Sequence, residues 1–260
     1  MPSWFLLQEP EPLPAAENMA RDEFLFDLCH EKKCGFLRLY SWKKPTFSIG
    51  VSQKSGRAMD LAFIRGRDCE YVRRLSGGKA VLHHREITYA VASSEDIFFK
   101  EHDLHQSYML ISRVLVQAIR SLGVDAVLSK GSAADLARSH NPCFSFPTPH
   151  EIEVAGKKIV GSAQKRDRLA LLQHGSIPLS MDYALYAGGA NFPAAALQKS
   201  MTTWEDISPL GAEALKQALV RSFVDFTGGE LEPMAFDDGD RPRIAALREK
   251  YASDAWNLSL

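Results

Sequence analysis

Short stretches in the first half of the chain carry bulky apolar residues at alternating or adjacent positions, as strands of a partly buried sheet do. Strands are expected at residues 3–8, 35–42 and 46–53, and residues 69–94 are expected to form a strand, a glycine loop and two further strands. Between the first two strands, Met19, Phe24 and Leu28 recur at roughly helical spacing with acidic residues among them. This pattern predicts a helix over residues 15–32.

The second half of the chain begins with the clearest helical pattern, residues 104–123, which Gly123 closes. Residues 150–180 predict a three-stranded meander, with turns at Ala155-Gly156 and at residues 165–168. Two more helical patterns follow, at residues 211–228 and 241–257. Runs of strands with a few helices predict an α+β fold with a mixed sheet.

An alanine- and glycine-rich stretch, residues 183–196, is interpreted as the boundary of the core domain. We therefore expect a catalytic core over residues 1–200. Residues 205–260 are expected to form a C-terminal helical extension packed on that core.

Composition and charge narrow the class of protein. Apolar residues make up 45% of the chain, enough for a packed core, and the net charge of -1 gives no general argument for binding nucleic acid or a membrane. The chain has no run of eighteen apolar residues, and its start lacks the basic and apolar regions of a signal peptide. The sequence thus predicts a cytoplasmic protein with neither nucleic acid nor membrane as partner.

The cysteines predict no metal site. Their spacing includes neither a CxxC pair nor a zinc-like cluster with histidine, and in a cytoplasmic protein unbonded thiols are expected. The four positions are Cys29, Cys34, Cys69 and Cys143.

The segment RRLSGGKAVLHH, residues 73–84, is the most specific local feature. Its two adjacent glycines allow a ligand to approach the backbone closely. Arg73 and Arg74 are suited to pairing with a carboxylate or a phosphate, although a plain hairpin turn with solvated arginines has the same pattern. The segment lacks both GxxxxGK[ST] and GxGxxG, which excludes a Walker loop and a Rossmann fingerprint.

Five segments together resemble one family. They are ENMARDE, RLYSWKKPTFSIGVSQ, RRLSGGKAVLHHREITYAV, GKKIVGSAQ and LLQHGSIPL, in this order along residues 4–182 and with plausible spacing. In these segments the chain resembles the lipoate–protein ligase/octanoyltransferase family, which has the biotin/lipoate ligase catalytic fold. The resemblance implies a mixed sheet flanked by helices, and a tunnel that holds a medium-length acyl chain.

The resemblance also implies site residues. The acyl-site loop of the family matches Arg74, Ser76, Gly77, Gly78 and His83; the family lysine matches Lys158, and the strand opposite matches His174 and Gly175. The chain departs from the ligase pattern at Lys79, where ligases have a third glycine, and at His84, where they have aspartate. Gly161 and Ser162 are candidates for an oxyanion hole made of backbone N–H groups.

Cys143 is the candidate nucleophile. It lies in a loop rich in proline and phenylalanine, which leads into the strand that carries Lys158. A lysine ammonium beside a thiol stabilises the reactive thiolate, and acyl transfer from a thioester to an amine is easiest through such a thiolate. The resemblance agrees, because the transferase branch has a cysteine ahead of its GKK motif. The alternative is a buried structural thiol. Lys157 is expected to point to the opposite face and into solvent.

The predicted reaction is octanoyl transfer from acyl carrier protein, through a Cys143 thioester, to the lysine of a lipoyl domain. The resemblance implies as acceptors the glycine cleavage H protein or 2-oxoacid dehydrogenase E2 subunits, and it implies no cofactor. A basic rim is expected to dock these acidic partners; its members are Arg73, Lys79, Lys157, Lys165, Arg166 and Arg168. Three alternatives remain open: a lipoyl-domain amidotransferase, an ATP-dependent lipoate–protein ligase, and a non-catalytic lipoyl- or biotin-binding module. The ligases usually need an accessory domain, and the tail here is two helices long.

Overall fold

A computed structural model describes residues 3–94, 100, 102–129, 144 and 151–260, and in this part of the chain eight strands form one mixed sheet. The strand order is β11-β1-β2-β6-β10-β9-β8-β7, with β1 parallel to both β11 and β2 and the later pairs antiparallel. The strands are β1 (Ser3–Gln8), β2 (Cys34–Tyr40), β6 (Glu86–Ser94), β7 (Ala126–Leu128), β8 (Ile152–Val154), β9 (Lys157–Arg166), β10 (Ala170–Pro178) and β11 (Glu232–Pro233).

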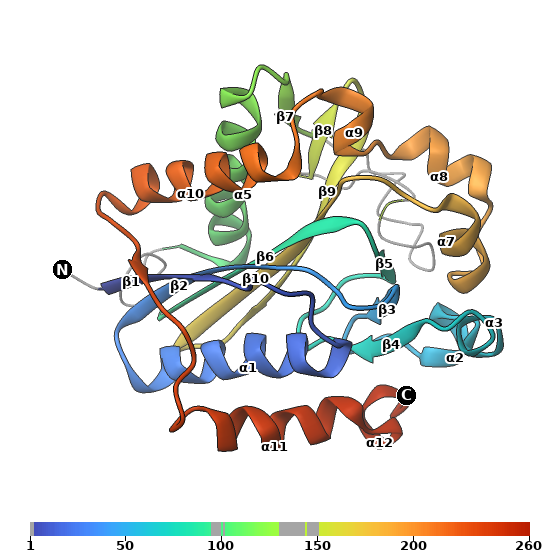
Figure 1. Cartoon of the computed structure of the whole chain (residues 1–260), viewed down its shortest axis with the longest axis horizontal. Coiled ribbons are helices and arrows are strands. Elements are labelled where there is room, and N and C mark those ends of the chain that lie inside the picture. Colours follow the sequence, from blue (N-terminus) through green and yellow to red (C-terminus); the bar gives the residue numbers. More distant parts are fainter. Residues whose placement is uncertain (1–2, 95–99, 101, 130–143, 145–150) are drawn as a thin grey trace.

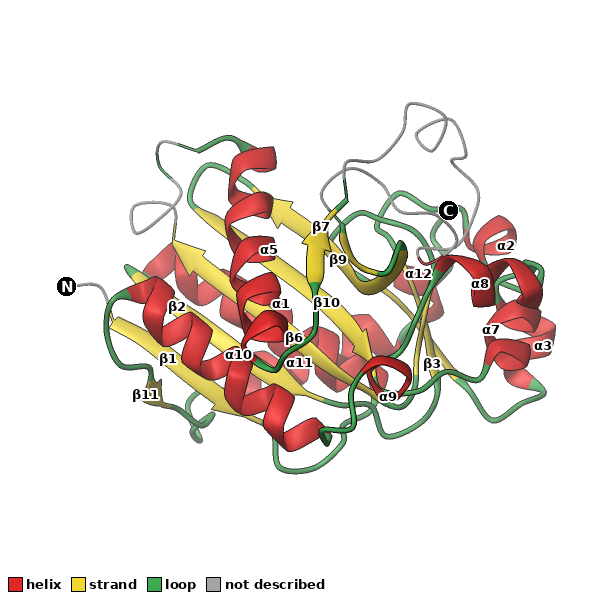
Figure 2. Ribbon diagram, turned by 90° about the horizontal axis from the view of Figure 1, so that it is seen from above, coloured by secondary structure: helices red, strands yellow, loops and turns green. Residues whose placement is uncertain are grey.

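Helices cover both faces of this sheet (Figures 1 and 2). One face carries α1 (Ala15–Glu31) and α11 (Arg241–Ala252), which pack on each other. The other carries α5 (Leu104–Ser121) and α10 (Ala212–Thr227), which also pack together. The helix α5 begins with a capping box between Asp103 and Gln106, which satisfies backbone donors of its first turn.

A smaller sheet lies beside the large one, with strand order β4-β3-β5. Its strands are β3 (Thr46–Ile49), β4 (Glu70–Arg73) and β5 (Val81–His83). Four helices surround it: α2 (Ser55–Ala58), α3 (Leu61–Arg65), α7 (Tyr183–Gly189) and α8 (Ala194–Ser200). The short α9 (Trp204–Ile207) and α12 (Asp254–Asn257) complete the described elements.

The α+β class and most of the expected elements are confirmed, including the meander and the helices after residue 204. The first meander turn has positive φ at Ala155 and Gly156, as a tight hairpin turn requires. Some bounds were predicted wrongly: the strand expected at residues 35–42 ends at Tyr40, and the helical pattern at residues 241–257 is divided into α11 and α12 at Ser253. The strand β9 continues to Arg166, because the Asp167 side chain accepts the amides of Leu169 and Ala170 and so fixes the turn later. The strand β3 ends at Ile49, where the chain meets the glycine loop.

The alanine- and glycine-rich stretch folds as α7 and α8. A Cβ atom on Gly188 or Gly189 would lie 2.2 Å from the Phe63 ring or 2.1 Å from the Phe47 ring, respectively. Small residues here therefore permit close helix packing. An alanine- and glycine-rich composition is equally typical of a linker, so composition alone does not distinguish the two. The domain boundary at residues 200–205 stays a prediction.

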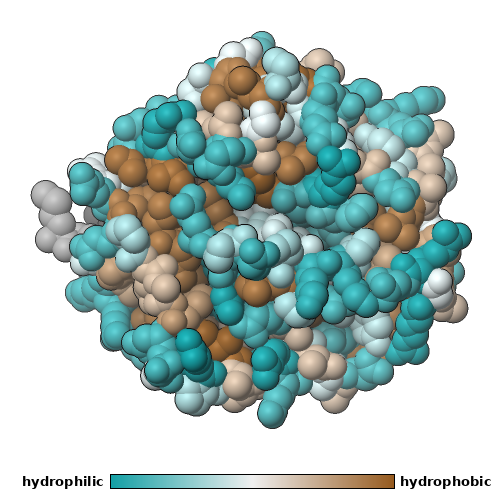
Figure 3. Space-filling model, in the orientation of Figure 1, coloured by the Kyte–Doolittle hydropathy of each residue, from teal (hydrophilic) through white to brown (hydrophobic). Residues whose placement is uncertain are grey.

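The surface in the Figure 1 orientation mixes polar and apolar side chains, and the apolar ones gather toward the edge near the N-terminus (Figure 3). Within the described ranges, no helix has the length and apolar content that crossing a membrane requires.

Candidate active site

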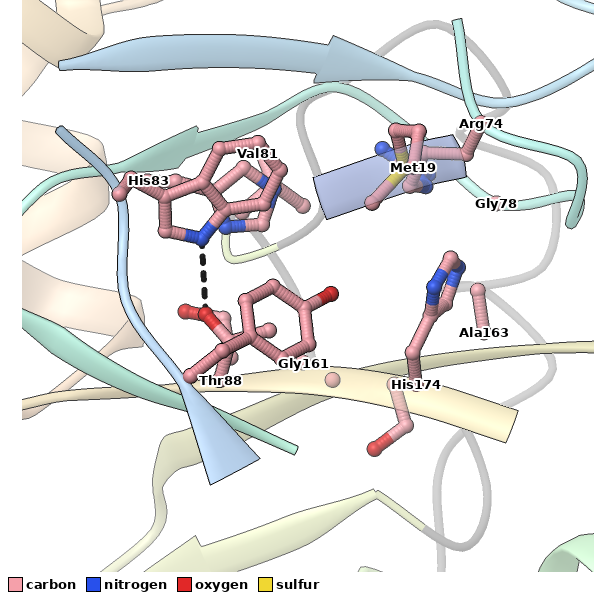
Figure 4. Close-up of a pocket in the computed structure, with 14 residues that line it drawn as sticks. Met19, Arg74, Gly78, Val81, His83, Thr88, Gly161, Ala163 and His174 are labelled. Carbon is pink, nitrogen blue, oxygen red and sulfur yellow. Dashed lines mark hydrogen bonds between the residues drawn. The ribbon is translucent and has the colours of Figure 1, made fainter. Parts of the chain in front are cut away.

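A small apolar cavity lies between the large sheet and the glycine loop. Figure 4 shows Arg74, Gly78, Ala163 and His174 on one side of it and His83 and Thr88 on the other. The lining residues are Met19, Tyr40, Trp42, Arg74, Gly78, Val81, His83, Thr88, Gly161, Ser162, Ala163, His174, Gly175 and Ser176.

His174 belongs to a chain of hydrogen bonds that starts on α1. Its Nδ1 lies 2.8 Å from Asp22 Oδ2, and its Nε2 lies 2.5 Å from Ser76 Oγ. The Asp22 carboxylate also accepts from Arg38 Nη1 at 2.7 Å and from the Tyr40 hydroxyl at 2.9 Å. An ionised Asp22 can only accept, so the ring proton of His174 lies on Nδ1 and Ser76 donates to Nε2.

Burial sets the charge states in this chain. Burial lowers the pKa of His174, and the hydrogen bond and charge of Asp22 offset this only in part, so the imidazole is neutral. For Asp22, burial alone would raise the pKa, but the hydrogen bond from His174 and the charge of Arg38 hold it below its ordinary value. The result is a buried Arg38–Asp22 ion pair that orients a neutral histidine.

His83 belongs to a second chain of the same kind. Arg74 Nη1 donates to Ser48 Oγ at 2.6 Å, so the Ser48 hydroxyl is directed to His83 Nε2, also at 2.6 Å. His83 Nδ1 then donates to Glu86 Oε1 at 2.8 Å. The ring stacks on Trp42 with centroids 4.2 Å apart. Both nitrogens of both histidines are thus engaged by protein groups, which favours a role in shaping the cavity wall over proton transfer to substrate.

The glycine loop packs closely against Gly50, the residue that follows β3. Gly78 has φ +89°, and a Cβ on Gly50 would lie 2.3 Å from the Gly78 carbonyl oxygen. Arg74 Nη2 donates to the carbonyls of Gly77 and Lys79, at 3.0 Å each, so it closes the loop on itself.

Arg73 does not belong to a docking rim, in contrast to the prediction. It is 1% exposed, and it donates to the carbonyls of Gly50, Val51 and Gln53 and, near the C-terminus, to those of Trp256 and Asn257. Its side chain therefore joins the base of the glycine loop to α12.

Lys158 lies near the start of β9 and its side chain is fully buried. Its Nζ pairs with the Glu151 carboxylate and lies 5.1 Å from the centre of the Phe144 ring. The neighbouring Lys157 is exposed, as expected, and donates to the Gln198 carbonyl at 3.1 Å. The alternation of the strand thus separates the two lysines.

Residues 14–224 match the lipoyl protein ligase A/B catalytic domain. The chain belongs to this family. It is 37% identical to octanoyltransferase LipM of Kyrpidia tusciae, with 99% of each protein covered. It is 34% identical to octanoyltransferase LipM of Brevibacillus brevis, with 95% of this chain and 96% of the relative covered. With such relatives over almost their whole length, the chain is an acyltransferase of the lipoyl protein ligase A/B family, and octanoyl transfer in protein lipoylation is its activity.

Solved structures of the family share the fold. A putative lipoate protein ligase of T. acidophilum with bound lipoic acid has a TM-score of 0.84 at 21% identity, with 99% of this chain and 100% of that chain covered. A lipoate-protein ligase A bound with ATP has a TM-score of 0.85 at 21% identity, with both chains fully covered. The predicted mixed sheet of the lipoyl protein ligase A/B fold is thus confirmed.

The predicted site residues of this lipoyl protein ligase A/B chain fall into four places. Seven of them line the cavity: Arg74, Gly78, His83, Gly161, Ser162, His174 and Gly175. Ser76 lies behind His174, and Gly77 is half-buried in the loop. Lys158 lies on β9 with Glu151, outside the cavity lining. Cys143 is outside the described residues, so its contact with Lys158 stays a prediction.

The oxyanion role of Gly161 and Ser162 also stays a prediction. The two residues pair with Ser176 and Gly175 of β10. The Ser162 hydroxyl lies 2.7 Å from that of Tyr89, which fixes this part of the wall.

The remaining cysteines have no part in the site. Cys29 and Cys34 are buried, and burial raises the pKa of Cys29 far above its ordinary value. Burial also raises the pKa of Cys69. Among the described residues, no group of three or more histidine, cysteine, aspartate or glutamate side chains could hold a metal ion.

Sequence reasoning missed the buried charged residues of this site. These are Asp22, Arg38, Glu86 and Glu151. Asp22 and Arg38 fall inside a predicted helix and strand, where a charged residue is expected to face solvent. A usable signal for Glu151 is its place at the start of the predicted meander, in the segment that pairs with the Lys158 strand.

Proposed function

We propose that the protein takes an octanoyl group from acyl carrier protein onto Cys143 and transfers it to the target lysine of a lipoyl domain. The acceptors are the glycine cleavage H protein or 2-oxoacid dehydrogenase E2 subunits. The octanoyltransferase relatives support the acyl group and the reaction class. A structural study of a family member concerns an archaeal lipoate protein ligase and its E2 lipoyl domain, which supports the acceptor class.

The buried position of Lys158 carries the proposal. A lysine is fully buried only where its charge has a use or a partner. The Phe144 ring contacts the Lys158 ammonium, and Phe144 directly follows Cys143 in the sequence. An ammonium in this position would stabilise a thiolate on Cys143.

The reaction then has two balanced steps. The Cys143 thiolate attacks the octanoyl thioester carbonyl, and the carrier thiol leaves as a thiolate that takes up a proton. The amine of the lipoyl lysine next attacks the Cys143 thioester, loses one proton, and releases the Cys143 thiolate again. The incoming thioester is already activated, so the proposal needs neither a cofactor nor a metal.

The apolar cavity is the proposed site of the octanoyl chain. Its walls place apolar atoms along β9 and β10, and the two histidines have no ring nitrogen left for water in their hydrogen-bonded arrangement. Such a wall favours an alkyl chain over a polar ligand.

The docking rim is part of the same proposal, without Arg73. Lys157 and Arg168 are exposed, and Lys79 and Lys165 are partly exposed. Arg166 donates to the His102 carbonyl at 2.5 Å, which holds it near the start of α5. The positive charge would favour encounter with acidic carrier and lipoyl domains. A cytoplasmic location is likewise proposed.

An intact-mass experiment tests the function. The protein is mixed with octanoyl-loaded acyl carrier protein without ATP, and an adduct of one octanoyl group that hydroxylamine removes is expected. It should be absent in Cys143→Ala, present in Cys69→Ala, and lost when a lipoyl domain is added. If no adduct forms and octanoate with ATP modifies the lipoyl domain, the ligase mechanism is correct instead. If only an octanoylated lipoyl domain loads the enzyme, the protein is an amidotransferase.

A further inference from the structure

We infer that Glu151 is a positioning residue of the transfer reaction, which holds the Lys158 ammonium charged and in place. The inference rests on the proposed function, because it concerns the lysine that would stabilise the Cys143 thiolate. Its own basis is the contact between the two side chains in the described part of the chain.

The backbone brings Glu151 and Lys158 together with little freedom. Glu151 directly precedes β8, and its carbonyl accepts the Ser129 amide at 2.7 Å. The strand β8 pairs antiparallel with β9, and the register shifts by one residue between Ile152 and Glu153. This irregularity re-aims side chains at the end of the hairpin, as β-bulges commonly do.

The Lys158–Glu151 ion pair is almost inaccessible to solvent. The Lys158 side chain is 0% exposed and the Glu151 side chain is 8% exposed. The Phe144 ring, also fully buried, covers the ammonium at 5.1 Å. Moving an ammonium from water into such surroundings favours loss of its proton unless an opposite charge is present. The Glu151 carboxylate supplies that charge.

The charged groups on neighbouring elements are less well placed for this role. Glu153 of β8 lies opposite Lys158 in the register but its side chain is partly exposed. Lys157 points outward, and Lys199 near the end of α8 is exposed. Met201, which bridges to Lys158 through the backbone, carries no charge.

The reaction cycle makes the carboxylate necessary at one stage. While Cys143 is a thiolate, that anion and Glu151 both stabilise the ammonium of Lys158. Once the sulfur carries the octanoyl group, its charge is gone, and Glu151 remains to keep the ammonium in position. The enzyme then regains the thiolate beside a lysine that is still charged.

The test is the pH dependence of the second step, transfer from the isolated octanoyl-enzyme to a lipoyl domain, measured in a single turnover from pH 6 to 9.5. The rate of each variant is divided by the wild-type rate at the same pH, which removes the titration of the attacking amine. Glu151→Gln keeps the shape but removes the charge, so the buried ammonium of the octanoyl-enzyme is expected to lose its proton at a lower pH. The relative rate of Glu151→Gln should therefore fall at least about tenfold between pH 6.5 and 9. Glu151→Asp should retain the wild-type profile.

Two controls separate this role from a structural one. Glu153→Gln is the same change two residues along and should leave the profile unaltered. In a Lys158→Met background, Glu151→Gln should cause no further loss, because its effect passes through the lysine. This comparison of Glu151→Gln in the wild-type and Lys158→Met backgrounds tests the role of Glu151 even if the single variant is less stable.

An unchanged profile in Glu151→Gln, or an equal loss at every pH in both Gln and Asp variants, would overturn the inference. Cys143→Ala distinguishes this from failure of the proposed function. If Cys143→Ala still loads, the proposed function is wrong; if it does not load and Glu151→Gln behaves as wild type, only the role of Glu151 is wrong.

Discussion

Asp22→Asn should destabilise the protein strongly, although the substitution changes neither size nor shape. The carboxylate of Asp22 accepts from Arg38, Tyr40 and His174, and all four groups are buried. An asparagine side chain has one accepting oxygen, and its NH₂ group would face donors. The Arg38 guanidinium, with a side chain 0% exposed, would lose its closest carboxylate.

The expected loss in the free energy of unfolding depends on the partners that Arg38 retains in Asp22→Asn. Breaking a buried ion pair from one side costs about 3–5 kcal/mol. Arg38 retains Glu9 at 3.0 Å and the side-chain oxygen of Asn18 at 2.8 Å, so the lower end, about 3 kcal/mol, is expected. With a urea m-value of about 3 kcal/mol per M, the unfolding midpoint should fall by about 1 M.

The pH dependence has a definite sign. The folded-state pKa of Asp22 lies below its ordinary value, so its contribution to the free energy of unfolding is present above that ordinary value and is lost as the pH falls through the folded pKa. The difference between wild type and Asp22→Asn should therefore be constant from pH 7 to about 5 and should narrow below about 4.

Asp27→Asn is the matched control on the same helix. Burial and the charge of Glu23 raise the pKa of Asp27, so this carboxylate is disfavoured in the fold and its removal should cost little. Urea unfolding followed by circular dichroism measures both variants. A loss below about 1 kcal/mol in Asp22→Asn, or an equal loss in both variants, would refute the argument that the ion pair organises this side of the cavity.

Two further predictions concern the cavity and the thiol. Gly175→Ala would place a Cβ 2.6 Å from the Tyr89 ring and 2.8 Å from the carbonyl oxygen of Gly161, which lines the cavity, so this part of the wall must shift. Octanoyl loading should fall at least about tenfold, and loading equal to wild type would show that the wall adapts. Iodoacetamide at pH 7 should label Cys143 faster than Cys69, whose pKa is raised by burial, and Lys158→Ala should slow only the first; equal rates in both proteins would contradict the pairing.

Local patterns in the sequence predict the elements well, because each depends on neighbouring residues. The hairpin at Ala155-Gly156 has positive φ at both residues, and the glycine, which adopts it without a steric penalty, is the local signal for the turn. The contact between Asp22 and His174 joins residues 152 positions apart, and periodicity carries no information about it. Only the family resemblance pointed to His174, and it left the partners on α1 unnamed.

Arg38 shows why alternation misleads in this sheet. It occupies a polar position in β2, which in a half-exposed strand would face water. But β2 pairs with both β1 and β6, helices cover the two faces, and each of its seven residues is buried. A charged residue at such a position needs buried partners of opposite charge, and Arg38 has Asp22 and Glu9.

The two hydrogen-bonded histidines and the buried Lys158 have different roles in the proposed site. Each imidazole is fixed between a carboxylate and a serine, so neither is poised to exchange protons with an acyl group in the cavity. The charge proposed for the transfer chemistry is instead that of Lys158 on β9, which is buried with Glu151, the residue before β8, outside the cavity lining. Changes to the histidines should therefore alter which acyl chain fits, whereas changes to Lys158 or Glu151 should alter the rate and its pH dependence.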